Sequence, residues 1–417
     1  MRNREVSDLR ETTLGQVLKR RSTRAKASDP LLSVTAERGV ILQEHSGRRD
    51  SSSADKSLYL AVNSGDIVYN TMRMWQGVSG LSVHSGIVSP AYTVCTPTSD
   101  VNPEYMARVL KHPGMVARFY RASQGLVSDT WNLRYTELAK IPVTLPSLPE
   151  QRRISEILDT VDDQLDAAGR FLNKLAVGRR AAVHDAMRNA LDELDRVQVS
   201  QVDGLIGKRE GAWEFCTLGV QLKGIQAGNS PNLEARPAKD GEWGVLKVSS
   251  VGRSGFHQDE NKVVDDVSLI DPSLEVRVGD LLMTRANTPE LVGMTCVVDR
   301  TRPGLMLCDK TLRLQLRPEA GSHRFVNELL SSTQVRRQIE VAATGTSGSM
   351  KNISQGAIRR LVIPWATGEV QENIVRLVEA HDLGMRSTAA EVMKLRWMKQ
   401  ALMDDLLTGC VRVPVAP

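Results

Sequence analysis

The chain has 417 residues, of which 41% are hydrophobic and 25% charged, so it is a globular protein too long for one ordinary core. No apolar run approaches a membrane span, and the charged start MRNREVSDLRETT does not resemble a secretory signal. A net charge of +5 permits a polyanionic partner without requiring one.

The five cysteines are scattered along the chain and form no CxxC pair. This usage predicts reduced thiols in a cytoplasmic protein, and it disfavours disulfides or a zinc site. The seven histidines do not cluster at ligand spacing, so we expect no metal in this chain.

In chain order, the first predicted elements return in the second half. TLGQVLK at 13–19 recurs as TLGVQLK at 217–223, and GDIVYNT at 65–71 recurs as GDLLMTR at 279–285. Two further pairs keep the same order: AKIPVTLP at 139–146 with RRLVIPWA at 359–366, and LPEQRRISEIL at 148–158 with EVQENIVRLV at 369–378. The offsets lie between 204 and 222 residues, which predicts a duplicated module rather than a solenoid.

Each half begins with a mixed region of short β-branched runs, broken by Gly, Ser and Pro, that predicts short strands and loops. The two Gly-Asp pairs are interpreted as turns entering apolar strands. Each half ends in a long helix. The expected boundaries are 1–147 for the first module, 148–200 for the first helix, 201–366 for the second module and 367–417 for the second helix.

The helices are predicted from apolar residues at alternating steps of four and three, the pattern of a coiled-coil face. The first stripe comprises Ile154, Leu158, Val161, Leu165, Ala168, Leu172 and Leu175. The second, weaker stripe comprises Ile374, Val378, His381, Met385, Thr388, Val392 and Leu395, in which His381 is interpreted as a packing residue.

Because neither stripe is stable in water, we expect the two helices to pair, and to pair antiparallel so that the modules do not crowd at one end. The fold class is therefore α+β: two globular modules separated by two long antiparallel helices that form a coiled coil, with a pseudo-two-fold internal repeat. A helix of about 28 residues spans about 42 Å, which corresponds to about 12 base pairs of duplex DNA.

Catalytic motifs are absent from the sequence. GLIGKRE at 204–210 lacks the upstream Gly and the Ser or Thr of a phosphate-binding loop, and no GxGxxG or GxSxG motif occurs. VNPEYM at 101–106 approaches an amino-methyltransferase signature, but Glu104 replaces its second Pro, so the segment is interpreted as a helix start. We expect a protein without catalytic activity.

The segment from Thr144 to Ala168, TLPSLPEQRRISEILDTVDDQLDAA, closely resembles specificity subunits of Type I restriction–modification enzymes, with Glu150, Gln151 and Arg152 matching residue by residue. Three other segments resemble further parts of that family in the expected order: Thr217–Pro231, Gly279–Gly293 and Met393–Gly409. The second copy departs from the pattern, because it has Val370-Gln371-Glu372 where the family usually has Glu-Gln-Arg.

The resemblance implies that each module is a target-recognition domain for double-stranded DNA. It implies two modification (methyltransferase) subunits as partners, docking at Glu150, Gln151 and Arg152, together with a restriction and translocation subunit. S-adenosylmethionine, ATP and Mg are then expected only in those partner subunits, and this chain would bind no cofactor.

Candidate DNA-binding residues follow from the major-groove code, in which Arg pairs with guanine and Asn or Gln with adenine. They lie after the Gly-Asp turns and in later loops: Arg73, Trp75, Gln76, Arg253, Arg285, Asn287, Lys351 and Asn352. SDTWNL at 128–133 adds Thr130 and Asn132. Any of these polar residues could instead be ordinary surface, and Trp75 could instead pack a small core.

Three other interpretations remain open at this stage: a stand-alone DNA-binding regulator with two unlike heads, a coiled-coil scaffold that binds protein, and an enzyme without a recognisable motif. A regulator requires tight binding by the chain alone. A specificity subunit is expected to co-purify with a methyltransferase bound near residues 150–161.

Overall fold

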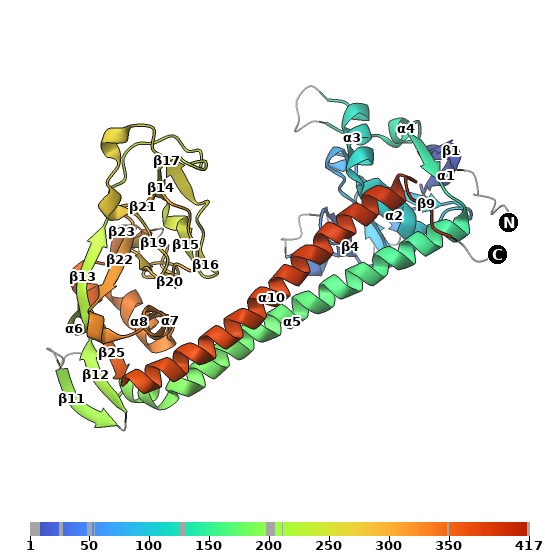
Figure 1. The fold of residues 1–417 in the computed structure, drawn as a ribbon. Coiled ribbons are helices and arrows are strands. Elements are labelled where there is room, and N and C mark those ends of the chain that lie inside the picture. The colour runs from blue at the N-terminus through green and yellow to red at the C-terminus, as the bar shows by residue number, and fades with distance from the viewer. Residues whose placement is uncertain are drawn as a thin grey trace, which may run out of the picture. The chain divides into compact units, whose positions relative to one another are not determined.

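The computed structural model describes residues 9–24, 28–47, 52–53, 55–125, 131–196, 205–210, 212–347 and 350–414. The chain divides into two compact units (Figure 1). Unit 1 comprises Met1–Phe171 and Thr388–Pro417, and unit 2 comprises Leu172–Ser387. Within the polar segment 46–57, residues 48–51 and 54 lie outside the described residues.

Unit 1 contains a four-stranded antiparallel sheet in the order β2-β9-β6-β7. Its strands are β2 (Leu18–Arg20), β9 (Tyr92–Pro97), β6 (Ile67–Asn70) and β7 (Ser79–Leu81). Two-stranded pairs surround it: β1 (Arg10–Thr13) with β10 (Pro142–Leu145), β3 (Leu32–Thr35) with β4 (Gly39–Leu42), and β5 (Leu60–Val62) with β8 (Gly86–Val88). The helices of this module are α1 (Leu14–Val17), α2 (Pro103–Lys111), α3 (Pro113–Ala122) and α4 (Tyr135–Leu138).

Unit 2 repeats this plan with the four-stranded antiparallel sheet β13-β22-β18-β20. Its strands are β13 (Leu222–Ala227), β22 (Thr311–Leu316), β18 (Leu281–Thr284) and β20 (Thr295–Val297). One smaller sheet contains β11 (Leu205–Glu210), β12 (Trp213–Thr217) and β25 (Val362–Ala366), and a second contains β17 (Asn261–Val263), β14 (Gly244–Leu246) and β21 (Leu305–Met306). A third contains β19 (Ala286–Asn287), β24 (Met350–Asn352) and β23 (Thr344–Ser347). The strands β15 (Val251–Gly252) and β16 (Gly255–Phe256) form a two-stranded pair. The helices are α6 (Leu218–Gln221), α7 (His323–Ser331), α8 (Thr333–Ala342) and α9 (Gln355–Arg359).

The duplicated Gly-Asp pairs form the same turn in both modules. Gly65 and Gly279 have φ angles of 91° and 92°, which glycine adopts without steric cost. The carboxylate of Asp66 accepts the backbone N–H of Asn63 and pairs with Arg21. In the same way, Asp280 accepts the N–H of Arg277 and pairs with Arg313. The interpretation of these pairs as turns is confirmed.

The helix start predicted at VNPEYM is also confirmed. The side chain of Asn102 accepts a hydrogen bond from the backbone N–H of Tyr105, and Pro103 occupies the first turn of α2. Asn is a favoured N-cap and Pro a favoured first-turn residue, so the local sequence fixes this helix start.

The two long helices, α5 (Leu148–Leu194) and α10 (Gly368–Leu407), have 47 and 40 residues. The estimate of about 28 residues was therefore too short. Apolar side chains of α5 beyond the stripe pack into the core of unit 2: Val183, Met187, Leu191 and Leu194. The stripe residues themselves are buried or half-buried, including His381.

Antiparallel pairing of the helices holds within each unit. In unit 1, the Lys399 ammonium lies 2.5 Å from the Asp162 carboxylate, and Arg412, just beyond α10, pairs with Glu150 at the start of α5. In unit 2, Arg179 of α5 lies 2.6 Å from Asp382 in the first half of α10. The predicted direction of pairing is therefore confirmed in both units.

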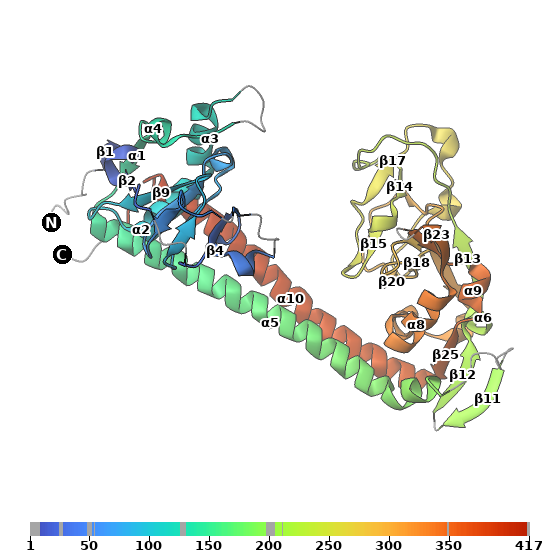
Figure 2. The ribbon, with the colours of Figure 1, turned by 180° about the vertical axis from the view of Figure 1, so that it is seen from behind.

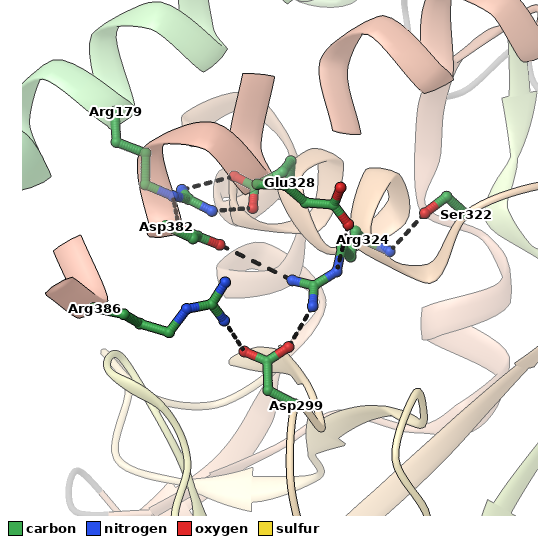
Figure 3. A network of polar contacts seen from close by, with 8 residues as sticks. Arg179, Asp299, Ser322, Arg324, Glu328, Asp382 and Arg386 are labelled. Carbon is green, nitrogen blue, oxygen red and sulfur yellow. Dashed lines mark hydrogen bonds and ion pairs between the residues drawn. The ribbon is translucent and has the colours of Figure 1, made fainter. Parts of the chain in front are cut away.

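A network of ion pairs joins the module of unit 2 to its helices (Figure 3). Arg179 of α5 donates to Glu328 of α7 at 2.7 Å as well as to Asp382 of α10. Burial by itself lowers the pKa of Arg179, but the hydrogen bonds and charge of Glu328, followed by those of Asp382, raise it above its usual value. Arg324 of α7 extends the network to Asp299.

Unit 1 has a related contact between its module and its helices. Arg108 of α2 pairs with Asp159 and Asp162 of α5, and α2 lies beside the start of α5 in both views (Figures 1 and 2). Asp162 also forms an ion pair with Lys399 of α10, so this one carboxylate connects α2, α5 and α10.

All five cysteines are free thiols, and four of them are buried. Burial raises the pKa of Cys95 to about 12, so this thiol stays protonated and unreactive at neutral pH. That these thiols are reduced in the cell stays a prediction. No helix among the described residues is long and apolar enough to cross a membrane.

Candidate nucleic-acid interface

Three candidates of the second module meet in one small sheet. Asn287 on β19 lies opposite Lys351 on β24, and Ala286 lies opposite Asn352. Arg285 precedes β19, has an exposed side chain, and accepts the backbone N–H of Ile353 on its carbonyl at 3.0 Å. Two loops that are more than 60 residues apart in the sequence therefore present Arg, Asn and Lys side chains together.

Arg253 belongs to the same region. It lies in the turn between β15 and β16, and its side chain is exposed. Glu290, in the loop that follows β19, has its pKa lowered by its own backbone and Thr288 hydrogen bonds and, in addition, by the nearby charge of Arg253. The structure thus groups every candidate of the second module around the segment that follows β18.

In the first module, Arg73 and Gln76 flank a short turn of helix and expose their side chains. Trp75 between them is half-buried and belongs to an aromatic cluster. Its ring lies 5.3 Å from Trp131 and 6.3 Å from Tyr120, and its indole N–H donates to the carbonyl of Met72 at 3.1 Å. Trp75 therefore has a packing role, and its contact with DNA stays a prediction.

The sequence reasoning did not single out Tyr120 and Trp131. Trp131 is adjacent to the candidate Asn132 in SDTWNL, and only 4% of the residues are aromatic. The rarity of aromatic residues could therefore have identified Trp131 as a further candidate. Asn132 exchanges two backbone hydrogen bonds with Gln124, and Thr130 lies outside the described residues.

The later loops of the two modules occupy equivalent places. The backbone N–H of Leu133 donates to the carbonyl of Thr71 at 2.8 Å, just as Ile353 donates to Arg285. Residues 131–133 and 351–353 therefore occupy equivalent positions in the two copies. Each segment lies against the segment that follows its Gly-Asp turn.

The predicted docking residues Glu150 and Gln151 are only 2% and 1% exposed. Glu150 accepts two hydrogen bonds from Arg412 and one from the backbone N–H of Val413. The Arg412 hydrogen bonds, more than the opposing effect of burial, hold the pKa of Glu150 below its usual value. Of the three docking candidates, Arg152 alone exposes its side chain, and docking by any of the three stays a prediction.

Gln151 and Gln371 form the same internal connection in both copies. Gln151 accepts the N–H of Asn102 at 2.9 Å and donates to the carbonyl of Pro146. Gln371 accepts the N–H of Ser322 at 3.2 Å and donates to the carbonyl of Ala366. The second copy thus keeps the glutamine that connects the helix to its module.

A metal site requires several ligating side chains close together. Within the described ranges, no group of three or more His, Cys, Asp or Glu side chains could hold a metal ion. The fold and the surface define a protein of two homologous modules, each presenting Arg, Asn, Gln or Lys from a pair of adjacent loops.

Comparison with known proteins shows which family the chain resembles. The family model of the type I restriction modification DNA specificity domain matches residues 117–175. The EcoEI specificity subunit of Escherichia coli is 29% identical over 251 residues, which is 54% of this chain and 42% of that relative. Over these segments the chain is similar to specificity subunits of type I restriction–modification systems, and its match spans less than half the length of the EcoEI relative.

Solved structures show the same fold. The S subunit of the type I restriction–modification system of M. genitalium superposes with a TM-score of 0.54 at 12% identity, over 97% of this chain and 98% of that one. A chain from a study of complex assembly and conformational transition of the type I system gives the same TM-score at 16% identity, over the same shares of the two chains.

Proposed function

We propose that this chain is the DNA sequence-recognition subunit of a type I restriction–modification complex. It reads a bipartite, asymmetric site in double-stranded DNA and positions two adenine methyltransferase subunits, with a restriction and translocation subunit, on that site. Methyl transfer and cleavage belong to those partners, which supply S-adenosylmethionine, ATP and Mg. This chain contributes recognition only.

One observation carries the proposal: the two modules place different side chains at the same structural position. The segment after the first Gly-Asp turn offers Arg73 and Gln76, whereas the segment after the second offers Arg285 and Asn287. Arg, Asn and Gln side chains discriminate between bases in the major groove. Because the equivalent loops of the two modules carry different side chains, the two modules are expected to recognise two different half-sites.

Methylome sequencing of cells that carry this chain with its methyltransferase partner tests the proposal. We expect methyladenine in a motif of two short, unlike blocks separated by a fixed gap, and loss of that methylation when the gene of this chain is deleted. A continuous motif, or methylation that survives the deletion, would contradict the proposal.

Arg285→Ala is expected to weaken discrimination in one half-site by about 1–3 kcal/mol, if the guanidinium makes a bidentate contact with guanine. Binding competition between DNA duplexes that differ at single positions measures this effect. Arg73→Ala is the matched variant, and it should relax only the other half-site. Unchanged affinity and unchanged discrimination in the Arg285 variant would remove this residue from the interface.

A further inference from the structure

Unit 1 contains a surface hollow lined by three arginines, Arg20, Arg24 and Arg134. The remaining lining is neutral: Ser22, Leu58, Leu60, Thr71, Pro90, Tyr92, Thr93, Tyr135 and Thr136. No carboxylate is among these described residues, and within the described part of the chain neither Arg20 nor Arg134 forms an ion pair. Three cations that share a hollow without a counter-ion repel one another, and an anion bound there removes that repulsion.

Arg134 is an unfavourable residue for its local structure. It occupies the N-cap of α4 and makes no capping hydrogen bond with its side chain. Its counterpart in unit 2 is Ser354, which follows Ile353 as Arg134 follows Leu133. Ser354 caps α9 by accepting the N–H of Ala357 at 3.1 Å. Replacing a Ser cap typically costs about 1 kcal/mol, so a function that requires a cation explains Arg134 better than local stability does.

Arg20 also differs from its counterpart. In the main sheet of unit 1, Arg20 and Ile67 lie on either side of Cys95. In the sheet of unit 2, Ile225 and Leu281 lie on either side of Leu314, so Ile225 occupies the position of Arg20. The first module therefore has two cations where the second has an apolar residue and a serine. This difference is confined to one of two copies that share a fold.

The hollow adjoins the candidate interface of the first module. Thr71 lines the hollow, and its carbonyl accepts the N–H of Leu133 beside Arg134. Arg73 and Gln76 follow Thr71 within five residues, so the hollow and these side chains share one segment. Arg24 donates to the carbonyl of Leu58, and both residues line the hollow.

We propose that this hollow binds one backbone phosphate of duplex DNA, and that it thereby sets the register of the first module on its half-site. The inference rests on the proposed function and adds to it a named phosphate site that the second module lacks. Guanidinium groups bind phosphate oxygens through strong charge-assisted hydrogen bonds. Phosphate contacts position a protein without selecting bases, so loss of this site should leave the recognised sequence unchanged.

The test compares the intact complex, containing this chain and its methyltransferase partner, with the double variant Arg20→Gln/Arg134→Gln. DNA affinity is measured over a range of salt concentrations, on the motif found by methylome sequencing. We expect binding roughly 5- to 20-fold weaker at low salt, and a salt slope smaller by about 1. Preference for the motif over single-base variants should be unchanged.

A matched control removes two exposed arginines of unit 2, Arg277→Gln and Arg360→Gln, which causes the same loss of charge. This control should keep the wild-type salt slope. Because Arg20 and Arg134 are exposed, the double variant should keep its fold, which thermal unfolding checks. A double variant with the wild-type slope overturns the phosphate site and leaves the proposed function standing.

Duplexes with a single neutral methylphosphonate locate the contact. One position in the half-site of the first module should weaken the wild type and leave the double variant unaffected. Titration with inorganic phosphate tests the alternative that the ligand of the hollow is a free anion and not a phosphate of the DNA backbone. If phosphate binding disappears in the double variant while every methylphosphonate duplex affects both proteins equally, the DNA assignment is wrong. A wild-type complex that prefers no sequence overturns both the proposed function and this inference.

Discussion

Replacing Arg179 by methionine is expected to lower the free energy of unfolding of unit 2 by about 3–5 kcal/mol. The substitution leaves the carboxylate of Glu328, whose side chain is 9% exposed, without its cation, whereas Asp382 keeps Arg324 at 4.0 Å. A buried charge that loses its partner keeps its full desolvation cost. Urea denaturation measures the loss, and hydrogen exchange of the α7 amides shows whether it is centred on the network of Figure 3.

Arg180→Met is the control for Arg179→Met, because Arg180 is the neighbouring residue and its side chain is exposed. It should change stability by no more than about 0.5 kcal/mol. Adding Glu328→Leu to Arg179→Met should recover part of the loss, since it removes one stranded charge. Equal stability of the Arg179 and Arg180 variants would show that the network contributes little.

Glu150→Gln is expected to destabilise unit 1 by about 2–3 kcal/mol near neutral pH. The amide has no negative charge and keeps only one acceptor oxygen, so its NH2 group faces a donor where the carboxylate accepts from Arg412 or the N–H of Val413. Glu156→Gln, at an exposed position on the same helix, is the control and should have a much smaller effect. Thermal unfolding of the three proteins at a single pH measures the difference.

The contribution of Glu150 should depend on pH in a defined direction. Its pKa is depressed in the folded state, so the stabilisation is fully present above the pKa of the unfolded chain, about 4.3 for Glu. The stabilisation is lost as the pH falls through the lower folded value. The gap in stability between wild type and Glu150→Gln should therefore narrow below about pH 4.3. A gap that is constant down to acid pH would mean that Arg412 does not act on the carboxylate.

The repeat and the helices could be predicted because their signals are local or periodic. Matching Gln151 with Gln371 identified two side chains that form the same hydrogen bonds in both copies. The Gly-Asp turns were recognisable because glycine at positive φ followed by an acceptor side chain has a strong sequence signature. The stripes marked residues that are buried or half-buried on α5 and α10, and the outermost of them pack into the module cores.

The helix lengths and the internal roles of the docking residues could not be predicted in this way. The stripe of α5 ends at Leu175, and the helix continues with apolar residues that face the core of unit 2 rather than another helix. The burial of Glu150 depends on Arg412, which is 262 residues away in the sequence. Periodicity describes a helix face, but it does not identify the distant partner that covers it.

The sequence predicted individual candidate residues in separate loops, but it did not predict which of these residues lie together on one surface. Lys351 and Asn287 were chosen for their chemistry, and their pairing in one sheet follows from strand register that local sequence does not encode. The convergence of Arg20 and Arg134 on one hollow depends likewise on tertiary structure. The aromatic cluster of Trp75, Tyr120 and Trp131 joins three segments by packing alone.

The pairing of Glu150 with Arg412 has a consequence for the order in which the protein matures on the ribosome. Unit 2 is one continuous stretch of chain, whereas unit 1 requires residues from both of its segments. The first module therefore cannot complete its fold when it is synthesised, because Glu150 lacks its partner Arg412 until about 260 more residues have been added. Unit 2, although it is translated later than the first module, should therefore reach its native state earlier. In nascent chains halted before Arg412, unit 2 should resist protease, whereas the helix start at Glu150 should be cleaved.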